Sequence, residues 1–150
     1  MPGRIEKAMN LASNLKALNE LFSADKVFSY LGLEITKVEE GHCEMSMPYS
    51  ERITRAGMVL NGGMMMAAAD FIGGLTAMTV NNGSDQVTQE LKINFLNPMH
   101  RGPFRLVSDV IKAGHKSVVI EIKLYDADGT MGIIGLGTWY IIHDRIIKKD

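Results

Sequence analysis

The sequence has little cysteine, little net charge and no long apolar run. Cys43 is the single cysteine among 150 residues, which excludes an internal disulfide, favours a reducing compartment and predicts an inert strand thiol. The formal net charge is −1, which gives no reason to expect nucleic acid or an anionic membrane as a partner. No apolar run approaches the roughly 20 residues of a membrane span, and the N-terminus lacks the apolar core of a signal peptide. We therefore expect a cytoplasmic protein.

Sequence motifs for metal and nucleotide sites are also missing. The four histidines are scattered without the spacing of metal ligands, and no paired cysteines accompany them. The chain has no glycine-rich phosphate loop and no Gly-x-Ser-x-Gly motif. Neither a metal site, nor nucleotide hydrolysis, nor a serine triad is indicated, and no cofactor is expected.

The length and the ordinary hydrophobic content of 46% predict one globular domain. Leucines at helical spacing between charged residues predict an N-terminal helix from Ile5 to Phe22, within residues 1–24. A core would follow over residues 25–143, and residues 144–150 would form a charged tail.

Strands and one long helix are expected in this core. The helix runs from about Gly62 to Val80 and is apolar nearly all round, so most of its sides need cover. Residues 30–48 alternate apolar and polar side chains around a turn at Glu40-Gly41. Four further strands follow the helix, at residues 87–96, 104–113, 117–126 and 131–142. This order favours an α+β fold with an antiparallel sheet against the helix, and a second copy of the chain would cover the helix's outer side.

Asp70 is the only charged residue between Arg55 and Asp85. Because it lies on the apolar helix, we expect its carboxylate to be buried, which is costly unless the group is paired, hydrogen-bonded or neutralised. A sequence that keeps such a group uses it for chemistry or for structure. Asp70 would be a catalytic base or nucleophile, or else an anchor for neighbouring backbone or for a dimer contact.

The start of the same helix, Asn61-Gly62-Gly63, has bare backbone. The first amides of a helix have no internal partners, and the helix dipole favours negative charge there. Glycine lets a substrate approach these amides closely. The turn is therefore either an oxyanion-binding site or only an N-cap followed by flexible glycines.

Three stretches in this order resemble the hotdog-fold acyl-CoA thioesterases of the phenylacetate-degradation (PaaI-like) type, over roughly residues 25–142. Residues 57–63 with Asp70 resemble the family's His-Gly-Gly and the acidic residue nine positions after the histidine. Residues 88–98 resemble a strand that ends in an aromatic residue, a variable pair and proline. Gly114-His115-Lys116, followed by the hairpin at 126–129, resembles the family's glycine-basic turn and last hairpin. Asn61 is a departure, because the family has histidine there.

The resemblance implies a curved antiparallel sheet wrapped around a long central helix, in a homodimer or homotetramer with shared active sites. It implies hydrolysis of an acyl- or aryl-CoA thioester, with coenzyme A as part of the substrate. Asp70 of one chain would face the Gly62 N–H of the other, with Gly63 as a further donor. Asn61 would add a side-chain donor or hold the loop, and Thr88 would help to hold the catalytic water or be an ordinary strand residue.

Five further residues are candidates for substrate binding. Met64 and Met66 would line an acyl or aryl pocket, or else be plain core. Lys116, His115 and Arg101 would contact the phosphates of coenzyme A, or else be surface cations.

Two other functions remain open at this point. The chain could be a non-catalytic acyl-CoA-binding or regulatory hotdog protein, which Asn61 in place of histidine supports. It could also be a hydratase or dehydratase, which is less favoured because no histidine lies near Asp70 in the sequence.

Overall fold

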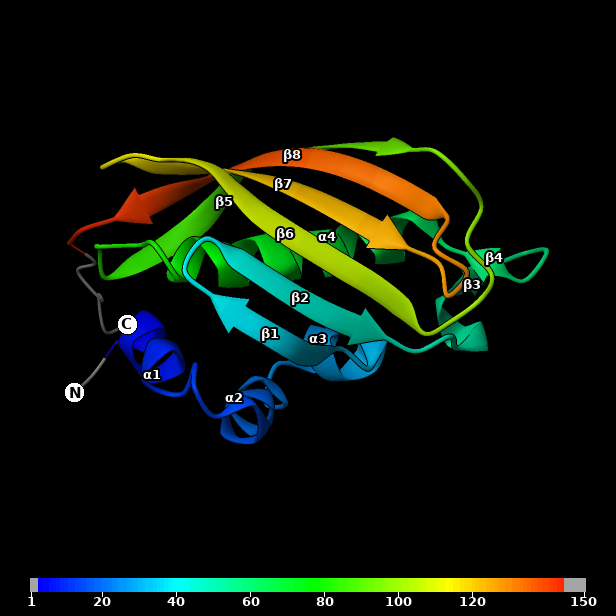
Figure 1. The fold of residues 1–150 in the computed structure, drawn as a ribbon, viewed down its shortest axis with the longest axis horizontal. Helices are drawn as coiled ribbons and strands as arrows, with labels where there is room; N and C mark the ends of the chain where they lie inside the picture. Colours follow the sequence, from blue (N-terminus) through cyan, green and yellow to red (C-terminus); the bar gives the residue numbers. More distant parts are fainter. Residues whose placement is uncertain (1–2, 145–150) are drawn as a thin grey trace, which may run out of the picture.

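A six-stranded antiparallel sheet curves around one long helix in the computed structural model, which describes residues 3–144 (Figure 1). The helices are α1 (Arg4–Asn10), α2 (Leu15–Phe22), α3 (Lys26–Leu31) and α4 (Gly62–Met78), with a 3-10 turn at Glu51–Ile53. The strands are β1 (Glu34–Glu39), β2 (His42–Met47), β3 (Thr54–Arg55), β4 (Val59–Leu60), β5 (Asp85–Phe95), β6 (Phe104–Ala113), β7 (Ser117–Tyr125) and β8 (Met131–Ile142). The sheet order is β1-β2-β6-β7-β8-β5, and β3 pairs with β4 separately. The expected α+β architecture is confirmed.

The prediction of one continuous N-terminal helix from Ile5 to Phe22 is wrong in its middle. The chain leaves the helix after Asn10 and starts α2 at Leu15. Asn14 caps α2, because its side chain accepts a hydrogen bond from the Ala17 N–H at 3.1 Å. A short polar side chain of this kind competes with a continuous helix and favours a new start.

A third helix, α3, occupies positions that the sequence analysis assigned partly to a strand. Asp25 begins α3 by accepting hydrogen bonds from two backbone amides, and Gly32 ends it with a φ of 66°. Such a left-handed residue is a common helix end. Tyr30 and Leu31 are therefore helical rather than extended.

The expected elements after residue 33 agree with the structure to within two residues at each end. The helix ends at Met78 rather than Val80, and β6 and β8 have the expected bounds. Cys43 lies fully buried in β2, where burial raises the pKa of its thiol to about 11. Residues 145–150 of the expected tail lie outside the described residues. No helix within residues 3–144 is long and apolar enough to cross a membrane.

One face of α4 is open to solvent, and this corrects the expected burial of Asp70. The sheet and α3 cover the face that carries Met65, Ala68, Ala69, Ile72 and Leu75. Gly63, Met66 and Asp70 follow one another at spacings of three and four residues and are exposed. They share a face of the helix that stays exposed within residues 3–144.

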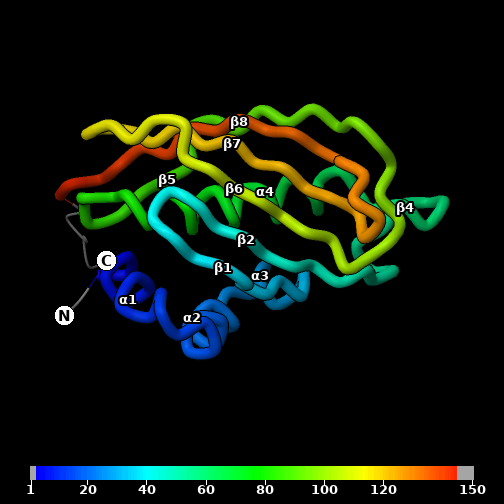
Figure 2. The backbone as a smooth tube through the Cα atoms, in the orientation of Figure 1, coloured from blue at the N-terminus to red at the C-terminus, as the bar shows by residue number. Residues whose placement is uncertain are grey.

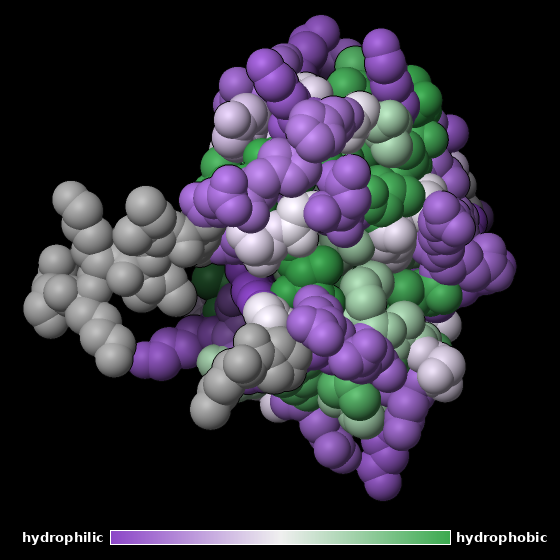
Figure 3. All heavy atoms as spheres, turned by 90° about the vertical axis from the view of Figure 1, so that its left-hand side faces the viewer, coloured by the Kyte–Doolittle hydropathy of each residue, from purple (hydrophilic) through white to green (hydrophobic). Residues whose placement is uncertain are grey.

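Aromatic rings join the N-terminal helices to α4. The Phe71 ring of α4 lies 5.5 Å from the Phe22 ring of α2 and 5.0 Å from the Phe28 ring of α3. Figure 2 shows α1 and α2 at the end of the molecule opposite the β3–β4 hairpin. Seen from that end, hydrophobic residues are exposed between hydrophilic ones (Figure 3). The N-terminal helices therefore form a wall beside α4.

Gly73 lets α4 lie directly against the ring of Trp139 on β8. A Cβ built on Gly73 would overlap the Trp139 ring, whereas one on Gly74 would be 3.7 Å from Trp139 Nε1, an ordinary contact. Trp139 itself is only 2% exposed, so its ring has no room to move aside. The close approach of the helix and the sheet depends on this glycine.

We expect Gly73→Ala to lower the free energy of unfolding by about 1–3 kcal/mol, because the added methyl overpacks a filled core. Gly74→Ala is the matched control, and it should stabilise the protein by about 0.5–1 kcal/mol through helix propensity alone. Urea unfolding of both variants measures the difference. Equal effects of the two substitutions would contradict this role of Gly73.

Candidate active site

Asp70 and Thr88 form a hydrogen-bonded pair between α4 and β5. The Thr88 hydroxyl donates to Asp70 Oδ1 at 2.6 Å. Thr88 pairs with Trp139 in the sheet, and the register shifts between Thr88 and Glu90, so a bulge directly follows the hydroxyl. Bulges re-aim side chains and are frequent beside active sites. This bulge and α4 together fix one carboxylate oxygen and leave the other open.

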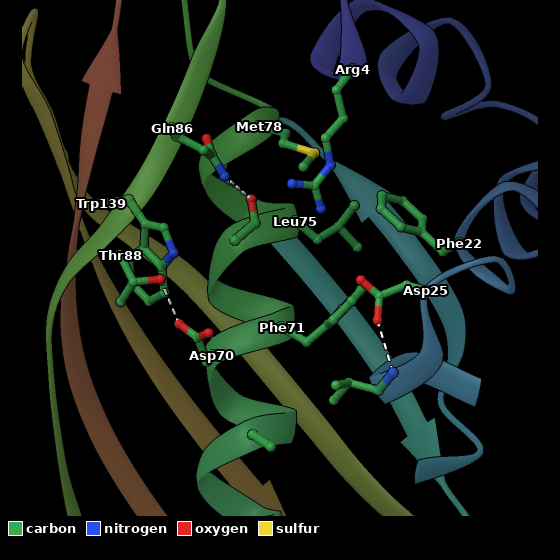
Figure 4. A pocket seen from close by; sticks show the side chains of 13 residues that line it. Arg4, Phe22, Asp25, Asp70, Phe71, Leu75, Met78, Gln86, Thr88 and Trp139 are labelled. Carbon is green, nitrogen blue, oxygen red and sulfur yellow. Dashed lines mark hydrogen bonds between the residues drawn. The ribbon is translucent and has the colours of Figure 1, made fainter. Parts of the chain in front are cut away.

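A cavity of about 370 Å³ adjoins this pair (Figure 4). One wall is α4, with Phe71 and Leu75, and another is formed by β5 with Trp139 of β8. The third wall is the N-terminal segment, which contributes Arg4 and Phe22. The volume suits a small-molecule ligand.

Asn61 caps α4, which is one of the two roles that the sequence indicated for this turn. Its Oδ1 accepts from the Gly63 N–H at 2.8 Å and from the Met64 N–H at 3.3 Å. This corrects the expectation that Gly63 is an oxyanion donor, because the cap already engages its N–H. Within residues 3–144, the Gly62 N–H has no acceptor. Gly62 therefore has the one free amide of this turn.

A second cavity, of about 420 Å³, lies beside Gly62. In the described part of the chain, Arg55 is the one charged residue that lines it, and the cavity also borders Met65 and Phe95. A Cβ on Gly62 would lie 3.3 Å from the Phe95 ring, so glycine allows this tight approach. The β3–β4 hairpin and the β5–β6 connection both reach this end of the molecule (Figure 1).

The two cavities are separate in one chain. They have no lining residue in common. Asp70 follows Gly62 by eight residues, which is about 12 Å along a helix axis. The carboxylate and the free amide of the same chain therefore cannot both contact one carbonyl group.

The remaining candidates line neither cavity. His115 and Lys116 lie in the β6–β7 turn, where the His115 ring stacks on His143 at 4.2 Å. Arg101 lies in the β5–β6 loop, and its backbone N–H donates to the Asp126 carboxylate at 3.2 Å. None of these three is brought to Asp70 in the protomer.

The methionines divide differently from the expectation. Met64 packs against the core, and Met66 is 37% exposed on the open face of α4. Met65, the third methionine of this run, is the one that lies beside Gly62. The helical period separates these neighbours by about 100° each, and only the packed structure shows which side faces a cavity.

Several site residues had no usable signal in the sequence. Arg4 and Trp139 are distant from Asp70 along the chain, and neither belongs to a motif. Gln86 joins β5 to α4, because its side chain donates to the Gly74 carbonyl at 2.6 Å. Within the described residues, no group of three or more His, Cys, Asp or Glu side chains is placed to hold a metal ion.

Comparison with known proteins identifies the family. Residues 57–133 match the thioesterase superfamily. A Saccharolobus solfataricus protein named "Putative esterase SSO2140" is 46% identical over 136 residues, which cover 90% of this chain and 97% of that protein. The chain belongs to the thioesterase superfamily. It is a thioester hydrolase.

Solved structures confirm the hotdog fold of this thioesterase. The thioesterase HI1161 from Haemophilus influenzae is similar with a TM-score of 0.80 and 27% identity, over 87% of this chain and 91% of that one. The PaaI protein from the E. coli phenylacetic acid degradation operon has a TM-score of 0.76 at 21% identity, over 93% of this chain and 96% of that one. The second likeness concerns the fold alone.

Proposed function

We propose that this thioesterase hydrolyses acyl- or aryl-CoA thioesters to the free acid and coenzyme A, as a PaaI-like enzyme of the cytoplasm. One observation carries the proposal. A carboxylate fixed by a hydroxyl and an unpartnered helix amide lie on one helix, each beside its own cavity. A base and an oxyanion donor are the two groups that thioester hydrolysis requires.

The proposed active enzyme is a homodimer, or a homotetramer built from such dimers. Asp70 of one chain would meet Gly62 of its partner if two α4 helices packed antiparallel through their open faces. The edge strand β5 leaves Val87 and Phe95 about half exposed, and so is Leu96 directly after it. A second copy would bury this apolar surface together with the open face of α4.

In the proposed reaction, Asp70 takes a proton from water as the water oxygen attacks the thioester carbonyl. The alternative is direct attack by the Asp70 carboxylate, followed by hydrolysis of the anhydride. In both cases the carbonyl oxygen becomes negative, and the Gly62 N–H at the helix N-terminus stabilises it. The C–S bond then breaks, and the coenzyme A thiolate takes up a proton.

Asn61 would keep the Gly62 turn in place during this reaction. Its side chain has no proton to transfer, so proton transfer would fall to Asp70. Lys116, His115 and Arg101 are proposed contacts for the phosphates of coenzyme A, since an assembled oligomer would bring surface loops of two chains together. Met64 and Met66 are proposed to border the acyl group there.

The test is a thiol-release assay across short-chain, long-chain and aryl CoA thioesters. We expect turnover of at least one class, with release of equal amounts of acid and thiol. Tight binding of CoA thioesters without turnover would instead select a non-catalytic acyl-CoA-binding protein. The acyl group that is turned over fastest would define the substrate class.

Thr88→Val should lower kcat roughly 10- to 100-fold, because it removes a hydrogen bond to a charged group while keeping the shape of the side chain. Thr88→Ser keeps the hydroxyl and should retain most of the activity. Steady-state kinetics and a thermal melt of both variants separate catalysis from folding. An equal loss in Thr88→Ser would contradict this role of the hydroxyl.

A further inference from the structure

Arg4 reaches from α1 into the cavity that contains Asp70 (Figure 4). Within residues 3–144, its guanidinium has no carboxylate within 4.0 Å and no hydrogen bond. A guanidinium in this position is available to a ligand.

Among residues 3–144, Arg4 is the only cationic residue that lines this cavity. Each of the two carboxylates that line the cavity accepts a hydrogen bond within the chain. Asp25 accepts from the Val27 and Phe28 amides at the start of α3, at 2.9 and 3.2 Å. Asp70 accepts from the Thr88 hydroxyl at the other end of the cavity.

The cavity has three zones along α4. Asp70 lies at one end, and Figure 4 shows Arg4 near Leu75 and Met78 at the other. Leu75 and Met78 follow Asp70 by five and eight residues, which is about 8 and 12 Å along the helix axis. The walls between are apolar, with Phe71 and Leu75 among their residues. A ligand that fills the cavity therefore passes from a carboxylate, through an apolar section, to a cation.

We propose that Arg4 selects thioesters whose acyl group is of medium length and ends in a carboxylate. This inference rests on the proposed function, because Asp70 marks where the thioester carbonyl lies. The methylene groups or ring of the acyl chain fill the apolar section. The terminal carboxylate forms a charge-assisted, two-point contact with the Arg4 guanidinium, which matches its planar geometry.

Arg4 would bind an anionic oxygen. Both a terminal carboxylate on the acyl group and the phosphates of coenzyme A carry such oxygens. The test therefore compares two thioesters of equal length, adipyl-CoA and hexanoyl-CoA, which differ only in the terminal carboxylate. Arg4→Gln should lower kcat/KM roughly 10- to 100-fold for adipyl-CoA and less than about threefold for hexanoyl-CoA. Lys7→Gln is the matched control, since Lys7 is an exposed cation of α1 that does not line the cavity. It should change neither value.

The same pair is measured as N-acetylcysteamine thioesters, which lack phosphates. An equal loss for both CoA thioesters that disappears with these analogues would assign Arg4 to the phosphates and overturn the proposal. Unchanged kinetics for both would overturn it as well. Calorimetry with the product acids gives a readout that needs no turnover: Arg4→Gln should weaken adipate binding and leave hexanoate binding unchanged. Equal binding of adipate to wild type and variant would contradict the proposal even if the thioesterase activity itself is confirmed.

Discussion

Asp70→Asn is expected to lower kcat by about 10²- to 10⁴-fold, the usual contribution of a positioned acid–base group. The substitution keeps the size of the side chain and an acceptor for the Thr88 hydroxyl, but it removes the group proposed to take the proton or attack the carbonyl. Asp70 is exposed in the single chain, so we expect its charge to matter little for folding. The melting temperature should therefore change little. Thiol release and a thermal melt measure the two effects.

The control for Asp70→Asn is the other carboxylate of the same cavity. Asparagine also caps helices well, so Asp25→Asn should preserve the start of α3. Asp25 is not part of the hydrogen-bonded pair Asp70–Thr88. It should leave the turnover of an uncharged acyl thioester near that of wild type. Activity retained in Asp70→Asn would refute the assignment of the base.

Gly62→Pro should remove the proposed oxyanion donor without removing the helix. Gly62 is the first residue of α4, a position where proline is favoured because the N–H has no helical partner. Asn61 before it is extended, with φ −65° and ψ 132°, which suits a residue that precedes proline. Loss of one such donor typically lowers kcat by about 10²- to 10³-fold. We expect that loss here, with helical content unchanged by circular dichroism.

Gly62→Ala separates the amide from the added carbon. Alanine and proline both place a Cβ near the Phe95 ring, but alanine keeps the N–H. Any loss that the two variants share reflects crowding, and the excess loss in Gly62→Pro reflects the amide. No excess loss would show that the Gly62 N–H is not the donor.

Mixing the two inactive proteins tests whether the sites are shared. If Asp70 and Gly62 act across a dimer, a mixed dimer has one site with both groups intact and one site with neither. After exchange of subunits, activity should return to roughly a quarter of the wild-type value, because half of the dimers are mixed. If each chain holds a complete site, mixing Asp70→Asn with Gly62→Pro restores nothing.

The local amino-acid sequence determined most of the helix and strand positions of this thioesterase. The apolar stretch after Asn61 predicted a helix whose sides must be covered by other parts of the protein. The helix begins at the predicted residue, Gly62. The turn signals at Asn97-Pro98 and at 126–129 predicted where the strands before them end, to within two residues. These features depend on neighbours a few residues away, which a sequence displays directly. Asp70 could also be identified from the sequence, because a single charged residue in an apolar run is visible without knowledge of its contacts.

Only the tertiary structure decided how these parts meet. Strand register brings the Thr88 hydroxyl to Asp70, and the sheet leaves that face of α4 open instead of burying it. The cap at Asn61 engages the Gly63 amide and leaves only the Gly62 amide free. Arg4 enters the cavity because the break before Asn14 folds the N-terminal helices alongside α4. Contacts between residues far apart in the chain depend on packing and register, which local periodicity does not encode.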